Sequence, residues 1–123
     1  MVTLLSTRSQ PARGEIWQVN FDPTIGAEIK KIRPSIVISS DAVGSLPIKL
    51  VAPVTTWDST FVGKIWLVKI SPDASNGLTQ DSAVDTLQIR CVDVRRFIRK
   101  VGFVSPIVME DIAAAVAIVV EYQ

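Results

Sequence analysis

Residues 21–38 read FDPTIGAEIKKIRPSIVI and join two apolar segments through a polar loop with several charges. The Asp22-Pro23 pair predicts the end of the first segment, because proline has no backbone N–H to donate to a strand partner. Arg33 precedes Pro34, whose ring pushes the preceding residue into an extended conformation. The stretch therefore predicts a strand, a charged loop and the entrance of a second strand.

Short apolar runs separated by turn residues continue to residue 104. Alternation of apolar and polar side chains in the first run is typical of a half-buried strand, and the later runs are rich in Val and Ile. Pro53 favours an edge strand or a bulge in the third run, and Asn76-Gly77 predicts a tight turn in a loop at 71–82. Strands are expected at 15–21, 35–39, 48–56, 63–70, 83–92 and 97–104.

After Ser105-Pro106 the strand-like pattern of apolar residues ends, and the pattern that follows predicts a helix. Serine is a good N-cap residue, and proline is favoured at the first helical position. Residues 107–122 are apolar around nearly the whole circumference of such a helix, with three acids as their only charges. A helix that is apolar all round is normally covered on more than one side. The second cover is either the protein's own barrel or another subunit.

Length and element pattern together predict one small β domain. A chain of 123 residues supports a single domain, and a domain of this size buries roughly two-thirds of its extended surface. We expect this domain to span residues 12–123, after a flexible leader at 1–11. Five or six short strands before one helix favour a small, strongly bent β-barrel over a sandwich.

The composition excludes several classes of function. The chain has no histidine and a single cysteine, Cys91, so neither an internal disulfide nor a structural zinc site is expected. The sequence contains no phosphate-binding glycine loop, nucleophile elbow or cluster of metal ligands, and we expect no cofactor and no metal. No apolar run approaches the roughly 20 residues that cross a bilayer, and the start lacks the pattern of a signal peptide. A soluble, cytoplasmic protein is therefore expected.

Three kinds of side chain in this pattern suit the chemistry of a phosphate group. A guanidinium fixed at a strand entrance, as for Arg33, can bind a phosphate through two parallel hydrogen bonds, although a surface pair with Glu28 would leave the same pattern. Thr55 and Thr56 end the third strand and offer two hydroxyls, although threonine is also an ordinary strand residue. Glu28 is a base, an orienter of Arg33 or a solvated loop acid.

The net charge of +1 gives no argument for or against a nucleic-acid partner. The distribution of the basic and aromatic residues is more informative. Five of the thirteen basic residues fall between Arg90 and Lys100 and are interleaved with an aromatic residue. This segment suits a phosphate track with a stacking platform or, equally, an amphipathic edge whose cations stay in water. Lys30 and Lys31 add to the positive field near the charged loop. Trp57 either stacks on a base or caps the core.

Three segments stand in an order that is similar to one known family. RGEIWQVNFDPTIGAEIKKIRPSIVIS (13–39) is similar to the family's opening strand, loop and strand, and VAPVTT (51–56) to its third strand. NGLTQDSAVDTLQIRCVDVRRF (76–97) resembles the segment in which a glycine loop precedes Asp-Ser and Gln-Ile-Arg. On these motifs, residues 13–122 resemble the MazF/PemK/Kid toxins of bacterial type II toxin–antitoxin modules, also called mRNA interferases.

The resemblance implies an SH3-like β-barrel with a C-terminal α-helix that acts as a homodimer. It implies a toxin that cuts single-stranded RNA, usually mRNA, sequence-selectively and without metal, by attack of the 2′-hydroxyl to give a 2′,3′-cyclic phosphate. A cognate antitoxin is the implied partner. By position, Arg33 and Thr55 match the family's catalytic arginine and hydroxyl, and Glu28 matches a loop acid. The implied RNA-binding residues are Lys30, Lys31, Thr56, Trp57, Gln88 and Arg90.

Departures from the family pattern limit what is carried over. Some relatives have an arginine and an aspartate just ahead of the Gln-x-Arg segment, where this chain has Asp85 and Leu87, so a Kid-type site that also uses a histidine is not expected. Thr56 is the alternative to Thr55 as the catalytic hydroxyl. Two other functions fit the same barrel: a CcdB-like inhibitor that binds DNA gyrase and cleaves nothing, and a degenerate toxin that binds only antitoxin or RNA. The pair of Arg33 and Thr55 favours cleavage, because a gyrase binder does not need it.

Overall fold

The computed structural model describes residues 10–43 and 45–122. The expected leader at 1–11 lies outside these residues, apart from Gln10 and Pro11. Within the described part, seven strands and four short 3-10 turns precede one α-helix. The strands and the helix are β1 (Glu15–Asn20), β2 (Ile32–Val37), β3 (Ile48–Thr56), β4 (Leu67–Ile70), β5 (Ser82–Asp85), β6 (Arg90–Asp93), β7 (Phe97–Phe103) and α2 (Pro106–Val119).

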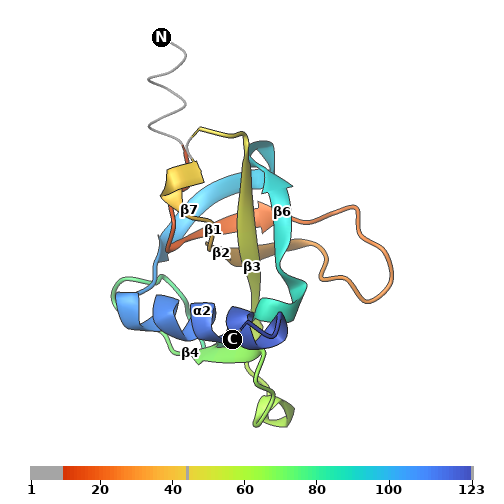
Figure 1. The fold of residues 1–123 in the computed structure, drawn as a ribbon, viewed down its shortest axis with the longest axis vertical. Coiled ribbons are helices and arrows are strands. Elements are labelled where there is room, and N and C mark those ends of the chain that lie inside the picture. Colours follow the sequence, from red (N-terminus) through yellow and green to blue (C-terminus); the bar gives the residue numbers. More distant parts are fainter. Residues whose placement is uncertain (1–9, 44, 123) are drawn as a thin grey trace.

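The antiparallel sheet bends around β3 (Figure 1). One edge of β3 pairs with β2, and the sheet continues from there through β1 to β7. Along the other edge, the first half of β3 pairs with β6 up to Val51, and the second half pairs with β5 from Val54 onward. Because one edge of β3 serves two partners, the sheet curls into a small, open barrel with a single helix beside it. The predicted architecture is confirmed.

Pro53 lies inside this central strand, so the expected edge strand or bulge in the third run is wrong. Leu50 faces β2, because its carbonyl oxygen accepts from the Ile38 N–H at 2.9 Å and its N–H donates to Ser39 Oγ at 3.2 Å. Backbone groups alternate between the two edges of a strand, so Pro53 faces the opposite edge. There it coincides with the gap between β6 and β5, and its missing N–H costs no ladder hydrogen bond.

The expected strand at 83–92 is in fact two strands. A 3-10 turn at Thr86–Gln88 interrupts it. The Asp85 carboxylate accepts a hydrogen bond from the Leu87 N–H at 3.0 Å, which satisfies a backbone donor at the start of the turn and ends β5. This capping is a local side-chain effect that β propensity does not report. Two other predicted strands begin elsewhere, β2 at Ile32 and β4 at Leu67.

The core has two parts, because both faces of the sheet are covered. Successive side chains of a strand point to opposite faces, so Ile36 belongs to one buried cluster and Val37 to the other. The larger cluster includes a residue of α2 and consists of Ile16, Ile36, Ala52, Val54, Ile70, Val84, Val104 and Ile112. The smaller cluster consists of Val19, Phe21, Val37, Val51 and Val92.

The helix begins where it was predicted and packs on one side only. The Ser105 hydroxyl accepts a hydrogen bond from the Val108 N–H at 3.2 Å, and Pro106 is the first helical residue. Ile112 and Ala115 are buried in the protein's own core, whereas the opposite side is open, so a helix sunk into its own barrel is wrong. Among the described residues, no helix combines the length and the apolar character needed to cross a membrane. The large exposed apolar residues of α2 and the end that follows it are Ile107, Ile118, Val120 and Tyr122.

The 71–81 loop approaches β7 closely at Gly77. The buried Asn76 closes the turn, since its amide nitrogen donates to the Ser71 carbonyl at 2.9 Å and its amide oxygen accepts from the Leu78 N–H at 3.0 Å. Gly77 has a φ of +68°, and a Cβ added to it would lie 2.3 Å from the carbonyl oxygen of Val101. Glycine is therefore required here both for the left-handed backbone and for the close contact.

We expect Gly77→Ala to lower the free energy of unfolding by about 1–3 kcal/mol more than Gly26→Ala, because overpacking against a backbone atom adds to the strain of the left-handed backbone. Gly26 is a matched control, since its φ is +58° and no atom lies within 4 Å of an added Cβ. Urea denaturation followed by circular dichroism measures both losses. Equal losses would contradict the close approach of the loop to β7.

Candidate active site

A pocket of about 310 Å³ opens where β2, the end of β3 and the loop before β5 meet. Arg33 comes from β2, Lys31 directly precedes β2, and Thr55 and Thr56 end β3. Gln80, from the 71–81 loop, also lines the pocket and was not singled out in the sequence. Four predicted site residues therefore share one pocket. The other lining residues are Ile32, Pro34, Val54, Leu78, Thr79 and Ser82.

Strand register explains how Arg33 and Thr55 come together. β2 and β3 pair in a register that matches Ser35 with Pro53. Continued by two residues past this last pair, the register matches Arg33 with Thr55. Alternation then sends these two side chains to one face of the sheet and that of Thr56 to the other. The register thus favours Thr55 over Thr56 as the hydroxyl on the guanidinium's face.

Arg33 is held by a backbone carbonyl and not by an acid. Its Nε donates to the carbonyl oxygen of Lys30 at 3.0 Å. In the part of the chain that the structure describes, no ion pair joins Arg33 to Glu28, and no hydrogen bond engages the two terminal guanidinium nitrogens. Those nitrogens can therefore bind an anion through two parallel hydrogen bonds.

Lys31 reaches the pocket from a left-handed backbone with a φ of 72°. For a residue with a side chain, this conformation costs roughly 1–2 kcal/mol. The Lys31 N–H donates to Asp22 Oδ1 at 3.0 Å, and the Lys31 carbonyl accepts from the Phe21 N–H at 3.0 Å. These bonds close the base of the β1–β2 loop and keep Lys31 beside the pocket. Lys30 is exposed and does not line this pocket.

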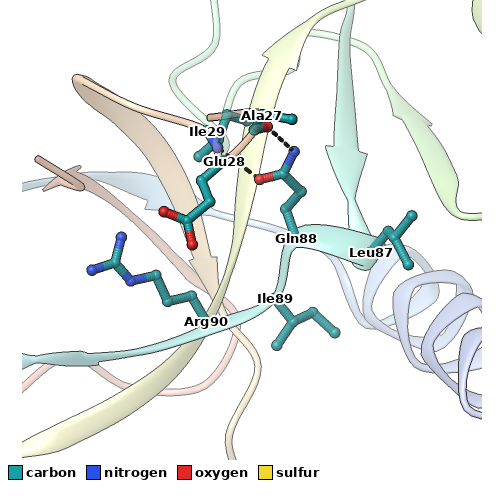
Figure 2. A pocket seen from close by; sticks show the side chains of 7 residues that line it. All are labelled: Ala27, Glu28, Ile29, Leu87, Gln88, Ile89 and Arg90. Atoms are coloured by element: carbon teal, nitrogen blue, oxygen red, sulfur yellow. Dashed lines mark hydrogen bonds between the residues drawn. The ribbon is translucent and has the colours of Figure 1, made fainter. Parts of the chain in front are cut away.

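Glu28 and Arg90 line a second cavity, of about 410 Å³ (Figure 2). The Glu28 carboxylate accepts a hydrogen bond from the Ile25 N–H at 2.7 Å, within its own loop. Figure 2 shows the Glu28 and Arg90 side chains extending into the same space. The structure therefore separates Glu28 from Arg33 and Thr55, and the three predicted catalytic residues do not share one pocket.

Gln88 fastens the β1–β2 loop to the rest of the protein (Figure 2). Its amide oxygen accepts from the Ile29 N–H at 2.7 Å, and its amide nitrogen donates to the Ala27 carbonyl at 3.2 Å. One side-chain amide thus satisfies a donor and an acceptor of a loop backbone that is 59 and 61 residues away in the chain. Gln88 was predicted to bind RNA, but its polar atoms are engaged by protein.

Two arginines of the basic segment hold the start of the same loop. Arg90 Nη1 donates to the Phe21 carbonyl at 3.0 Å, and its guanidinium lies 5.9 Å from the centre of the Phe21 ring. Arg96 Nη1 donates to the carbonyls of Asn20 at 2.9 Å and Asp22 at 2.7 Å. Carbonyls at a strand end lack ladder partners, and a charged donor satisfies them well. Part of the basic cluster thus has a structural use.

Asp85 supports the turn that carries Gln88. Partial burial raises the pKa of its carboxyl, and hydrogen bonds from the N–H groups of Leu87 and Gln88 lower it, with a net upward shift. A carboxyl whose pKa is raised in the folded state adds stability at low pH, and this contribution is lost as pH rises from the unfolded-state pKa through the folded-state pKa. Ionised Asp85 therefore carries a burial cost that its two backbone donors only partly offset.

Trp57 follows Thr56, and both its backbone and its ring make contacts within the protein. Its backbone N–H donates to the Asp81 carbonyl at 3.0 Å. Its ring packs edge-on against Phe61, with ring centres 5.6 Å apart, and the Lys69 ammonium lies 5.0 Å from the Trp57 ring centre. The ring is therefore partly covered, and its role in base stacking stays a prediction. Within the described residues, no group of three or more side chains suited to metal ligation is found.

The fold and the pocket define a class of protein: a small, open β-barrel with one C-terminal helix and a pocket lined by an arginine and two threonines. The sequence model of the PemK-like, MazF-like toxins of type II toxin–antitoxin systems matches residues 12–120. The chain belongs to this family.

Individual relatives agree with this assignment. Endoribonuclease MazF9 of Mycobacterium tuberculosis is 34% identical over 100 residues, which make up 76% of this chain and 81% of that protein. The crystal structure of MazF from Deinococcus radiodurans superposes with a TM-score of 0.76 at 23% identity, covering 90% of this chain and 96% of that one. A mycobacterial endoribonuclease solved in complex with its cognate antitoxin superposes with a TM-score of 0.72 at 19% identity, covering 92% and 97%. At such low identity these structures support the fold alone.

We expect Gln88→Met to speed hydrogen exchange of the Ile29 amide by about 3- to 10-fold, the worth of one net hydrogen bond in a locally opening loop. Amide exchange followed by NMR measures the rate, with the Val19 amide in β1 as internal reference. Leu87→Met is the matched control, because its exposed side chain makes no hydrogen bond to the loop. An unchanged Ile29 rate would show that Gln88 does not fasten the loop.

Proposed function

We propose that the chain is an endoribonuclease toxin that cleaves single-stranded RNA, chiefly mRNA, in the cytoplasm. The observation that carries the proposal is the convergence of Arg33 and Thr55 on one face of the sheet, in an open pocket. Membership of the toxin family supports it, as does the 34% identity to a protein named an endoribonuclease. These residue types suit a phosphate whose charge increases during reaction.

The proposed reaction uses a nucleophile that RNA itself supplies. The 2′-oxygen bonds to phosphorus while the bond from phosphorus to the 5′-oxygen breaks. The 2′-hydroxyl loses its proton to a base, and the departing 5′-oxygen gains a proton. The products are a 2′,3′-cyclic phosphate and a 5′-hydroxyl, and neither a metal nor a cofactor is needed to balance the step.

In this proposal, Arg33 stabilises the negative charge that develops on the phosphate. A guanidinium keeps its proton up to a pH of about 12, so it serves better as a donor to the phosphorane oxygens than as a general acid. The Thr55 hydroxyl, on the same face, donates to the same group. Donors fixed in position before the reaction stabilise the transition state without reorganising, which is commonly the largest catalytic contribution.

Glu28 is our candidate for the base that receives the 2′ proton. Its loop leads directly into Arg33, and a carboxylate is chemically suited to the step. Because it borders the second cavity, this role requires the β1–β2 loop to swing toward Arg33, against the hold of Gln88 and Arg96. The residues proposed to bind the flanking RNA are Lys30, Lys31, Thr56, Trp57, Gln88 and Arg90.

We expect the purified chain to cut a long single-stranded RNA in EDTA, and Arg33→Ala and Thr55→Ala each to slow cutting by about 10²–10³-fold, the usual cost of one lost oxyanion donor. Gel analysis of RNA fragments with mapped ends measures the rate and the products. Arg95→Ala is the matched control, since Arg95 is exposed and already paired with Asp93 at 2.9 Å.

Intact RNA at every protein concentration would refute the proposed activity and leave the gyrase-binding and degenerate-toxin readings to be tested. Cutting that survives both substitutions would refute the proposed site while keeping the activity.

We further propose that the toxin is a homodimer and that a cognate antitoxin binds it. The antitoxin complex of the mycobacterial relative supports the second statement. The exposed apolar side of α2 supports the first, because Ile107 and Ile118 are 71% and 50% exposed. Exposed apolar patches commonly mark protein interfaces.

Light scattering at micromolar concentration should give about twice the chain mass of 13.4 kDa. We expect Ile118→Asp to return the protein to a monomer, because a carboxylate in an apolar interface is costly to bury. Ile65→Asp, at an exposed position 61% accessible and distant in the chain from α2, is the control. A wild-type mass of 13.4 kDa would contradict the dimer.

A further inference from the structure

Gln80 makes a side-chain contact inside the pocket that the proposed mechanism does not use. Its amide nitrogen lies 3.0 Å from Thr56 Oγ1, and 24 residues of chain separate the two. Both residues line the pocket that Arg33 also lines. Both residues are exposed, and a hydrogen bond between exposed groups adds little to folding stability. Any effect of this hydrogen bond therefore lies in the pocket and not in folding stability.

The chemistry of the two groups sets the direction of this bond. An amide nitrogen carries hydrogens and no acceptor, so the Thr56 hydroxyl oxygen accepts. The hydroxyl proton must then point away from Gln80. Within the described part of the chain, no protein acceptor receives that proton. It is left free to donate to a ligand in the pocket.

Accepting a hydrogen bond also makes the hydroxyl a better donor. Linked hydrogen bonds polarise one another and strengthen each other by about 10–30%. A hydroxyl that is already oriented loses less rotational freedom when a ligand binds. Both effects favour an anionic oxygen near Thr56, on the side of β3 opposite to the Thr55 side chain.

We propose that Gln80 is a positioning residue, which turns the Thr56 hydroxyl toward a phosphate of the flanking RNA, next to the phosphate that Arg33 and Thr55 hold. This inference rests on the proposed ribonuclease function. Thr55 and Thr56 leave β3 in opposite directions, so the two hydroxyls bind different phosphates of the RNA. Gln80 contributes through Thr56 and makes no contact with RNA.

A double-mutant cycle between Gln80→Met and Thr56→Val tests this, measured as the single-turnover cleavage rate of a short RNA in EDTA. Methionine keeps the length of glutamine without its amide, and valine keeps the shape of threonine without its hydroxyl. At subsaturating protein, we expect Thr56→Val to slow cleavage by about 10- to 100-fold, the worth of one hydrogen bond to a charged group, and Gln80→Met by about 3- to 10-fold. The double variant should be within about twofold of Thr56→Val alone, because Gln80 has nothing left to position.

Two outcomes of the cycle overturn the inference. Losses that multiply in the double variant would mean that Gln80 acts independently of Thr56. Faster cleavage by Gln80→Met would mean that Gln80 takes the Thr56 proton instead of directing it to the phosphate. Thermal unfolding of each variant is recorded alongside, and a rate loss that tracks a lower melting temperature would assign Gln80 a structural role only.

A binding measurement separates this inference from the ribonuclease proposal. A 2′-O-methyl version of the same oligonucleotide lacks the nucleophile, and its dissociation constant is measured by fluorescence anisotropy for the four proteins of the cycle. If the wild type cleaves nothing, the proposed function fails, while the same non-additivity in the dissociation constant still supports the role of Gln80. Additive losses of affinity, or no binding by the wild type, would overturn the inference as well.

Discussion

The pairing of β3 with two different strands along one edge is the constraint on which the rest of this structure depends. The change of partner from β6 to β5 lets the sheet curl, and it falls at Pro53, the one residue of β3 that has no N–H to donate. On the other edge, the pairing with β2 carries Thr55 to the face of Arg33. The strand around which the sheet curls is thereby also a strand that builds the pocket.

The positive charge of this family member is divided between structure and chemistry. Arg90 and Arg96 bind backbone carbonyls at the start of the β1–β2 loop, and Gln88 holds its middle. Arg33 and Lys31 instead line the open pocket. The sequence does not distinguish a guanidinium that satisfies strand-end carbonyls from one that binds a phosphate. Only the position of the acceptor distinguishes the two.

Strands and the helix were predicted well where one or two adjacent residues mark their start. Ser105 and Pro106 marked the helix start, and Arg33 before Pro34 was placed near the start of β2. The break at Thr86–Gln88 was missed because the apolar run continues through it, and only the Asp85 cap reveals the turn. Gln80 and Arg96 were missed because a single polar side chain carries no mark of a partner far away in the chain.

The sequence by itself determined the order of strands and helix, the absence of histidine chemistry, and the family to which the chain belongs, because these depend on residue types and short-range spacing. The tertiary structure decided which side chains meet. It joined Arg33 to Thr55 in one pocket, moved Glu28 to another, and set Gln80 against Thr56. The physical reason is that strand register and loop packing bring these side chains together through contacts between residues far apart in the chain. No local sequence pattern encodes such contacts.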